Sequence, residues 1–205
     1  MEIRIANKSD YPKLRELWNL VFGDSPDFVD MLYERLDATG YIVCEDDTVV
    51  SGLTFFEVGE YEGRKVKMSY AICTHPNYRG KGYVSKLISF VYENEISDDE
   101  LSLICPAEKS LIKFYSKTNY QPFFYAKEES SKATEKINIS IQSISPKEYM
   151  DYREQFLKDI PHIKLNQNFL EFIEKDSLNS NSLILINGGD AICVIEDIKN
   201  DTIII

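Results

Sequence analysis

The chain has 205 residues, of which 43% are hydrophobic and 28% are charged, with only 9 Gly and 7 Pro. This composition supports a packed core and excludes a chain that is disordered or collagen-like throughout. Asp and Glu outnumber Lys and Arg by 34 to 23, and the net charge of −11 argues against nucleic acids and anionic membranes as partners. The length suits one large domain or one and a half ordinary domains.

Residues 1–14 lack the basic start and apolar run of a secretory signal, and no stretch approaches the roughly 20 apolar residues of a membrane span. We therefore expect a cytoplasmic protein. Two histidines and four widely spaced cysteines provide no metal-ligand spacing, so we expect no metal site. The cysteines lie in apolar, strand-like segments, and we expect four buried, reduced thiols at Cys44, Cys73, Cys105 and Cys193.

The first part of the chain changes from a helical to a strand-like pattern. Ser9 and Asp10 are typical capping residues before an apolar helical face, and Gly23 ends that helix. Alternating strands then follow, separated by turn residues, which predicts an antiparallel meander. The predicted elements are a strand at Ile3 and Ile5, helices over 11–22 and 25–36, strands over 41–44, 49–58 and 66–74, a helix after Gly82, a strand over 101–105, a helix over 109–117 ending near Asn119, and a strand over 123–125.

Residues 128–136 are polar and rich in Ser, Glu and Lys, which is typical of a linker. The elements predicted after it repeat the order of the chain's beginning. They are a strand over 137–141, helices over 146–157 and 166–176, and a meander of strands over 183–186, 191–195 and 202–205. We therefore predict a domain over 1–127, a linker over 128–136 and an incomplete second domain over 137–205.

The segment Tyr70–Val84 carries the strongest chemical pattern, because a strand runs into a glycine-containing loop that opens a helix. The first N–H groups of a helix are unpaired and the helix dipole is positive there. Glycines let the backbone approach a ligand, so such a loop can hold an anion such as a pyrophosphate. Arg79 and Lys81 add two cations to the loop.

This segment resembles the acyl-CoA-binding signature of the GNAT superfamily of N-acyltransferases, Q/R-x-x-G-x-G/A. Arg79 takes the first position and Gly82 the central glycine, whereas Val84 stands where Gly or Ala is usual. The resemblance extends over roughly residues 1–127, through 17–24 on one side and 105–115 on the other. It implies an α/β (α+β) fold with a mixed, mainly antiparallel sheet flanked by helices. The whole chain resembles a bacterial two-part member with a partial second GNAT-like half, which would shape the acceptor site or form a dimer surface.

The resemblance implies that acetyl-CoA is the co-substrate and that it binds to one strand end and one loop. The backbone of Ile72, Cys73 and Thr74 would contact the pantetheine arm, and a N–H near Cys73 would polarise the thioester carbonyl. The N–H groups of the loop and first helical turn would hold the pyrophosphate. These residues are Gly80, Lys81, Gly82, Tyr83, Val84 and Ser85, with Arg79, Lys81 and Lys86 as further phosphate contacts.

The resemblance also makes Tyr115 the acid that protonates the departing thiolate. The general base is open: Glu57 is the first candidate, with Tyr70 and Glu45 as alternatives. His75 fits a turn better than catalysis, and Cys73 has no partner that would make it a nucleophile. Phe22, Phe28, Tyr33, Phe55 and Phe56 are either acceptor-pocket or core residues.

We thus expect direct transfer of an acetyl group to a primary amine in a ternary complex. The acceptor is a small molecule or a peptide amine, and the protein could form a homodimer. The alternative is a non-catalytic sensor or scaffold that binds acyl-CoA through a degenerate GNAT fold, which the departure at Val84 favours.

Overall fold

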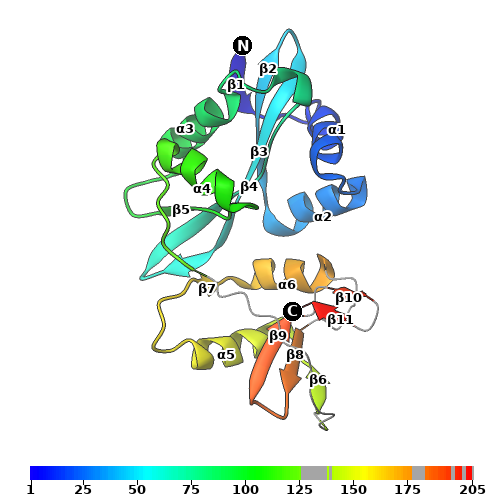
Figure 1. Cartoon of the computed structure of the whole chain (residues 1–205), viewed down its shortest axis with the longest axis vertical. Coiled ribbons are helices and arrows are strands. Elements are labelled where there is room, and N and C mark those ends of the chain that lie inside the picture. The colour runs from blue at the N-terminus through cyan, green and yellow to red at the C-terminus, as the bar shows by residue number, and fades with distance from the viewer. Residues whose placement is uncertain (126–137, 139, 177–182, 195–196, 200–201, 205) are drawn as a thin grey trace. The chain divides into compact units, whose positions relative to one another are not determined.

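The computed structural model describes residues 1–125, 138, 140–176, 183–194, 197–199 and 202–204. The chain divides into two compact units, Met1–Pro122 and Phe123–Ile205 (Figure 1). The linker predicted over 128–136 lies outside the described residues, and the domain boundaries stay a prediction. Among the described helices, none is long and apolar enough to cross a membrane.

The first unit is a mixed sheet with helices on both faces (Figure 1). The strands lie in the order β1–β2–β3–β4–β5, with antiparallel neighbours from β1 to β4 and with β5 parallel to β4. This arrangement confirms the predicted mainly antiparallel fold and its meander. The elements are β1 (Glu2–Ile5), α1 (Tyr11–Phe22), α2 (Pro26–Leu36), β2 (Thr39–Glu45), β3 (Thr48–Tyr61), β4 (Arg64–Thr74), a 3-10 turn (Pro76–Tyr78), α3 (Tyr83–Glu95), β5 (Leu101–Ile104), α4 (Lys109–Tyr115) and a second 3-10 turn (Ser116–Thr118).

Local signals at the helix ends are mostly confirmed. Ser25 caps α2 by accepting a hydrogen bond from the Phe28 N–H, and Gly23 ends α1 in the left-handed conformation. Asp10 precedes α1 but does not cap it, which corrects the expectation for this residue. Its carboxylate instead pairs with both terminal nitrogens of Arg4, at 2.5 and 3.0 Å, and this bond lowers the pKa of Asp10.

Alternation along β2 divides the core into two layers. Tyr41 and Val43 pack with the apolar face of α3, whereas Ile42 and Cys44 pack with α1. On the α1 face, Leu14 lies directly over the backbone of two neighbouring strands. A Cβ atom on Gly52 would overlap Leu14 Cδ1, and one on Gly40 would lie 2.9 Å from Leu14 Cδ2. These glycines therefore set how closely α1 approaches the sheet.

The strand predicted over 123–125 is wrong, because residues 121–125 have no regular secondary structure. Phe123 and Tyr125 are exposed, at 64% and 84%. Aromatic residues favour strands only where a neighbouring strand receives them, and none of the described strands pairs with this segment.

The second unit contains a three-stranded antiparallel sheet with the order β6–β8–β9. The strand order of this sheet corresponds to β1–β2–β3 of the first unit. That the second unit is a partial GNAT-like domain stays a prediction. The prediction of the meander is wrong for its last strand. This strand, β11, pairs with β10 and not with β9, and the β10–β11 pair is antiparallel. The elements are β6 (Ile141–Ser143), α5 (Pro146–Phe156), β7 (Lys164–Leu165), α6 (Gln167–Asp176), β8 (Leu183–Ile186), β9 (Ala191–Val194), β10 (Asp197–Lys199) and β11 (Thr202–Ile204).

Replacing Gly52 with Ala should destabilise the protein by about 1–3 kcal/mol, because the new methyl group overlaps Leu14. Urea unfolding of the two single variants, Gly52→Ala and Leu14→Ala, and of the double variant measures this. In the double variant the added methyl group occupies space that Leu14 vacates, so its cost should be smaller than the sum of the two. Costs that add to within about 0.5 kcal/mol would contradict the close packing.

Candidate active site

Strand β4 changes direction at Ala71, whose φ of 47° lies in the left-handed region. The register with β3 pairs Thr54 with Tyr70 and Gly52 with Cys73, so Leu53 faces two residues of β4 instead of one. This is a β-bulge, which bends the strand and interrupts its ladder. The predicted pantetheine contacts, Ile72 to Thr74, begin directly after it.

Strands β4 and β5 separate at the same point. Their parallel pairing runs from Val66 to Ser69 on β4, opposite Leu101 to Ile104 on β5. Beyond Ser69, none of the described strands pairs with the outer edge of β4, so the backbone groups of 70–74 on that edge have no strand partner. An open strand edge of this kind can pair with an extended amide-containing ligand.

The end of β4 is anchored by two side chains, Ser51 and Arg79. The Ser51 hydroxyl, which is fully buried, donates to the carbonyl oxygen of Cys73 at 2.6 Å and lies 2.9 Å from the Thr74 hydroxyl. Arg79 Nε lies 3.3 Å from the Thr74 carbonyl oxygen and donates to it. Sequence reasoning missed Ser51, although a serine within the apolar strand at 49–58 is a usable signal for such a role.

The loop after β4 leads into the N-terminus of α3, as the sequence predicts. Gly80 and Gly82 both have left-handed φ values, 81° and 76°, and a Cβ on either would meet no atom within 4 Å. Gly82 is the N-cap and offers no side chain to the first turn of the helix. The N–H groups of this turn therefore need a partner from outside the helix, and an anion suits them.

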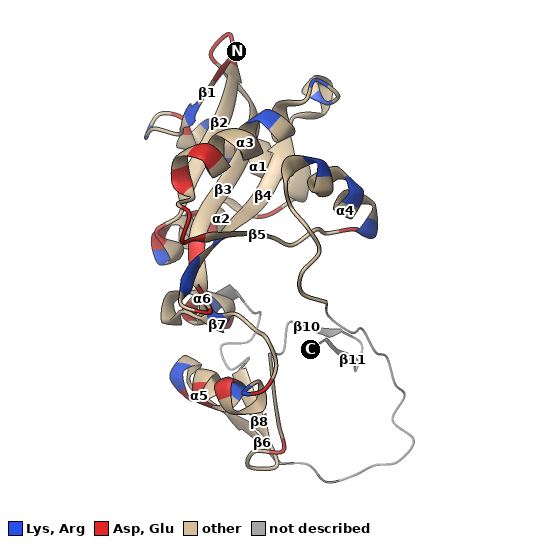
Figure 2. Ribbon diagram, turned by 90° about the vertical axis from the view of Figure 1, so that its left-hand side faces the viewer, with Lys and Arg blue, Asp and Glu red and all other residues tan. Residues whose placement is uncertain are grey.

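The charges around this loop are more positive than the chain as a whole. Figure 2 shows Lys and Arg at the beginning of α3 and along α4, and Asp and Glu at the end of α3. Lys81 Nζ lies 3.5 Å from Glu45 Oε2 and 4.9 Å from the centre of the Tyr78 ring. The Tyr83 hydroxyl also donates to Glu45, so one carboxylate contacts the loop residue Lys81 and the first residue of α3.

Tyr115 lies at the end of α4, and its ring packs against the core cluster beneath α3. Ile72, Tyr78 and Val84 pack against the same cluster, so the predicted acid lies on the same face as the predicted CoA-binding residues. Burial raises the pKa of Tyr115, with a smaller contribution from Tyr120. A phenol in this setting stays protonated and can donate a proton.

Tyr120 is a second tyrosine that sequence reasoning did not single out. Its hydroxyl lies 2.5 Å from the Ser102 hydroxyl and 3.4 Å from that of Ser69. Ser69 is the last β4 residue that pairs with β5. Tyr120 therefore bridges the two strands at the point where they separate.

The three base candidates have different surroundings. Glu57 is 42% exposed and its Oε2 lies 3.3 Å from Lys65 Nζ. Tyr70 lies on the face of the sheet that carries α1, with its ring 5.9 Å from that of Trp18 and 5.8 Å from that of Phe56. Glu45 contacts Tyr83 and Lys81 on either side of the N-cap of α3.

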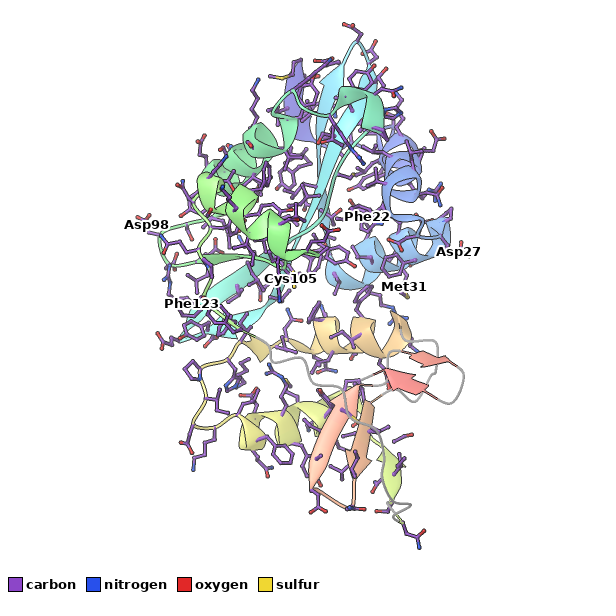
Figure 3. The ribbon with its side chains drawn as sticks, in the orientation of Figure 1. Phe22, Asp27, Met31, Asp98, Cys105 and Phe123 are labelled. Carbon is purple, nitrogen blue, oxygen red and sulfur yellow. The ribbon has the colours of Figure 1, made fainter. Side chains whose placement is uncertain are left out.

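The aromatic residues considered for an acceptor pocket fall on both faces of the sheet. Phe22 and Phe28 contact Trp18, with ring centres 6.2 and 6.3 Å apart, and Phe22 lies at the end of α1 (Figure 3). Phe55 packs with Tyr41 in the core under α3. Phe55 therefore belongs to the core and is removed from the pocket candidates.

Cys73 and His75 lie near the strand end without the features of reactive groups. Burial raises the pKa of the Cys73 thiol to about 12, so it carries no appreciable thiolate near neutral pH. His75 Nδ1 accepts a hydrogen bond from the Asn77 N–H and begins a 3-10 turn, which confirms its turn role. No group of His, Cys, Asp and Glu in the described part of the chain has the arrangement of a metal site.

The expectation of four buried thiols is wrong for one residue. Cys44, Cys73 and Cys193 are buried, but Cys105 is exposed (Figure 3). The apolar pattern at 101–105 suggested burial throughout. However, β5 ends at Ile104, and Cys105 lies beyond the paired region.

A family model described as "Acetyltransferase (GNAT) domain" matches residues 2–123, more than half of the chain. Solved structures share the fold at low identity. An acetyltransferase from Trypanosoma brucei is 18% identical, with 63% of this chain and 99% of that chain covered and a TM-score of 0.53. An aminoglycoside 6'-N-acetyltransferase from Acinetobacter haemolyticus is 21% identical, with 65% and 99% covered and a TM-score of 0.50.

AAC(6')-Iy in complex with the bisubstrate analogue CoA-S-monomethyl-acetylneamine is 18% identical, with 64% of this chain and 98% of that chain covered and a TM-score of 0.52. The comparison with curated protein sequences finds no match.

The exposure of the cysteines predicts their order of reaction with a thiol reagent. One thiol, Cys105, should react rapidly in the native protein, and the other three should react only on unfolding. Timed labelling with a chromogenic disulfide measures this, and Cys105→Ser should remove the rapid phase. A rapid phase that persists in this variant would contradict the burial of the remaining thiols.

Proposed function

Because the chain belongs to the GNAT family of acetyltransferases and is thus an acyltransferase, we propose that it transfers an acetyl group from acetyl-CoA to a primary amine by direct transfer in a ternary complex. The observation that carries this proposal is the open edge of β4 at residues 70–74, which leads to the N-terminus of α3. An extended acyl donor with a pyrophosphate at its far end has complementary features.

The residues at this site fit acetyl-CoA in three respects. The bulge at Ala71 and the parting of β4 from β5 leave backbone groups for the amides of the pantetheine arm. The left-handed Gly80 and Gly82 leave open space beside the first turn of α3, where the pyrophosphate would accept N–H hydrogen bonds. Arg79, Lys81 and Lys86 supply local positive charge in an acidic chain.

Tyr115 is proposed as the general acid. The amine nitrogen forms a bond to the thioester carbonyl carbon, the carbon–sulfur bond breaks, and the thiolate takes a proton from the Tyr115 hydroxyl. The amine nitrogen loses its proton to a base. A N–H near Cys73 would stabilise the charge on the carbonyl oxygen during this step.

Glu57 remains the first candidate for the base, and Tyr70 the second. The Glu57 side chain is partly exposed, and β3 alternation puts it on the same face as Phe55, where Tyr115 also packs. Glu45 is a weaker candidate because Tyr83 and Lys81 engage its carboxylate.

The acceptor is proposed to be an amine of a small molecule or peptide. Two of the similar solved structures are aminoglycoside N-acetyltransferases, and the net charge of −11 favours a cationic amine in solution.

Replacing Gly82 with Glu should weaken CoA binding at least about tenfold, because a carboxylate would lie beside the pyrophosphate. Calorimetry with acetyl-CoA measures this. Gly63→Glu is a matched control, since Gly63 also has a left-handed φ and open space but lies in the β3–β4 turn. Each variant should lose about 1 kcal/mol of stability from backbone strain.

Absence of acetyl-CoA binding by the wild type at millimolar concentration would contradict the enzyme proposal. Equal loss in both glycine variants would show that charge or instability, and not position, causes the effect.

Replacing Tyr115 with Phe should lower turnover by about 10²–10⁴-fold, because the leaving thiolate loses its proton donor. Release of free thiol from acetyl-CoA with a panel of primary amines measures turnover and identifies the acceptor. Affinity for acetyl-CoA should stay within about twofold, and Tyr92→Phe, at an exposed position of α3, is the control.

The pH dependence has a definite sign. The acid must be protonated to act, and burial raises the pKa of Tyr115, so turnover by the wild type should fall on the alkaline side only above about 10, the ordinary tyrosine value. Unchanged turnover in Tyr115→Phe would remove this residue from the mechanism.

A further inference from the structure

Glu45 is the last residue of β2, and its carboxylate contacts both sides of the helix start at Gly82. One oxygen accepts a hydrogen bond from the hydroxyl of Tyr83, the first residue of α3. The other lies 3.5 Å from Nζ of Lys81, the residue before Gly82. The Glu45 side chain is 29% exposed and the Tyr83 residue 4%, so these contacts form at the edge of the core.

The segment that Glu45 contacts contains two glycines without packing side chains, whereas Tyr83 itself is packed in the core under α3. Gly80 and Gly82 each have wide conformational freedom, and neither has a side chain to pack. The Lys81 ammonium lies over the ring faces of Tyr78 and Tyr83, at 4.9 and 5.8 Å, which places it between the loop and the helix. A single fixed carboxylate can therefore restrict both residues that flank the N-cap.

We infer that Glu45 is a positioning residue, which holds Lys81 and Tyr83 so that the N–H groups from Gly80 to Ser85 are arranged for the pyrophosphate before it binds. This inference rests on the proposed function. It assigns Glu45 to donor recognition, in place of the role as an alternative base.

Two physical effects of Glu45 oppose each other, and they predict opposite results. Its negative charge repels a pyrophosphate, but an exposed charge is screened by water and salt over about 8–10 Å. A loop that must be ordered on binding loses conformational entropy, about 1–2 kcal/mol for each residue fixed. We expect the entropic cost of ordering the two glycines and Lys81 to exceed the free energy of the screened repulsion. Loss of Glu45 should therefore weaken the binding of acetyl-CoA.

The pKa values agree with a stable contact at neutral pH. The hydrogen bond from Tyr83 lowers the pKa of Glu45, and the same bond raises the pKa of Tyr83. Because the folded-state pKa of Glu45 is depressed, the contact is present above its ordinary value and is lost as pH falls through the folded value. It is therefore complete at the pH of an ordinary assay.

The test compares two acyl donors in wild type, Glu45→Ala and Glu45→Gln. One donor is acetyl-CoA, and the other is S-acetyl-N-acetylcysteamine, a truncated thioester that lacks the pyrophosphate. Glu45→Ala should raise the KM for acetyl-CoA about tenfold and leave kcat within about twofold. Glu45→Gln keeps an oxygen for the Tyr83 hydroxyl and should recover most of the affinity.

With the truncated donor, both variants should match wild type in kcat/KM, because that donor does not reach the loop. Glu60→Gln removes one negative charge from an exposed position near the end of β3 and is the control for net charge. Tyr83→Phe should raise the KM for acetyl-CoA in the same direction. The double variant Tyr83→Phe, Glu45→Ala should cost no more than the larger single effect. Thermal unfolding of each variant confirms that the fold is retained.

Four outcomes would overturn the inference. A KM for acetyl-CoA that is unchanged or lower in Glu45→Ala would show that the carboxylate does not arrange the loop. A loss of equal size with the truncated donor would indicate a general structural role. A fall in kcat with both donors would return Glu45 to the list of bases. An additive double variant would show that Tyr83 and Glu45 act separately.

If the wild type binds no acetyl-CoA, the proposed function fails, whereas normal binding in wild type and Glu45→Ala overturns this inference alone.

Discussion

Strands β4 and β5 are held together over four residue pairs and then diverge, and the candidate site depends on where this separation begins. Below that point Lys67 Nζ lies 2.9 Å from the Glu100 carboxylate, and Arg64 donates to the Glu100 carbonyl oxygen at 2.8 Å. These contacts, with the parallel ladder, fix β5 beside β4. At the point of separation the Tyr120 hydroxyl contacts Ser102 and Ser69. The side chains of Lys67, Arg64 and Tyr120 therefore stabilise the paired part of β4 and β5 up to the point where the strands separate.

Above the separation, the same strand is held from its other side. Gly52 lets α1 pack closely on β3, Ser51 fixes the Cys73 carbonyl, and Arg79 fixes that of Thr74. The bulge at Ala71 then directs the strand end toward the loop that opens α3. An open strand edge and an adjacent helix N-terminus result, and both present backbone donors. Backbone groups that are already in place before binding lose less conformational entropy when a ligand binds.

The fold could be predicted from the sequence where its determinants are local. Hydrophobic period, the Ser25 cap and the Gly23 stop placed helices and strands within a few residues, because each depends on neighbours along the chain. Features that depend on contacts between different elements of the fold could not be predicted. Asp10 pairs with Arg4 instead of capping α1, and Phe55 faces α3. Cys105 is exposed because β5 ends one residue earlier, and Glu45 contacts residues 36 and 38 positions away. The site loop itself was predictable because its glycines, cations and following helix lie within one short segment.

The central claim is that the open edge of β4 and the first turn of α3 form one binding surface for CoA. Amide hydrogen exchange of the wild-type protein, measured by residue with and without CoA, tests it most directly. The account predicts slower exchange on CoA binding at 72–74 and at 80–85 together, with little change in the β3–β4 turn at 62–63. Protection confined to other segments, or present at only one of these two, would contradict it.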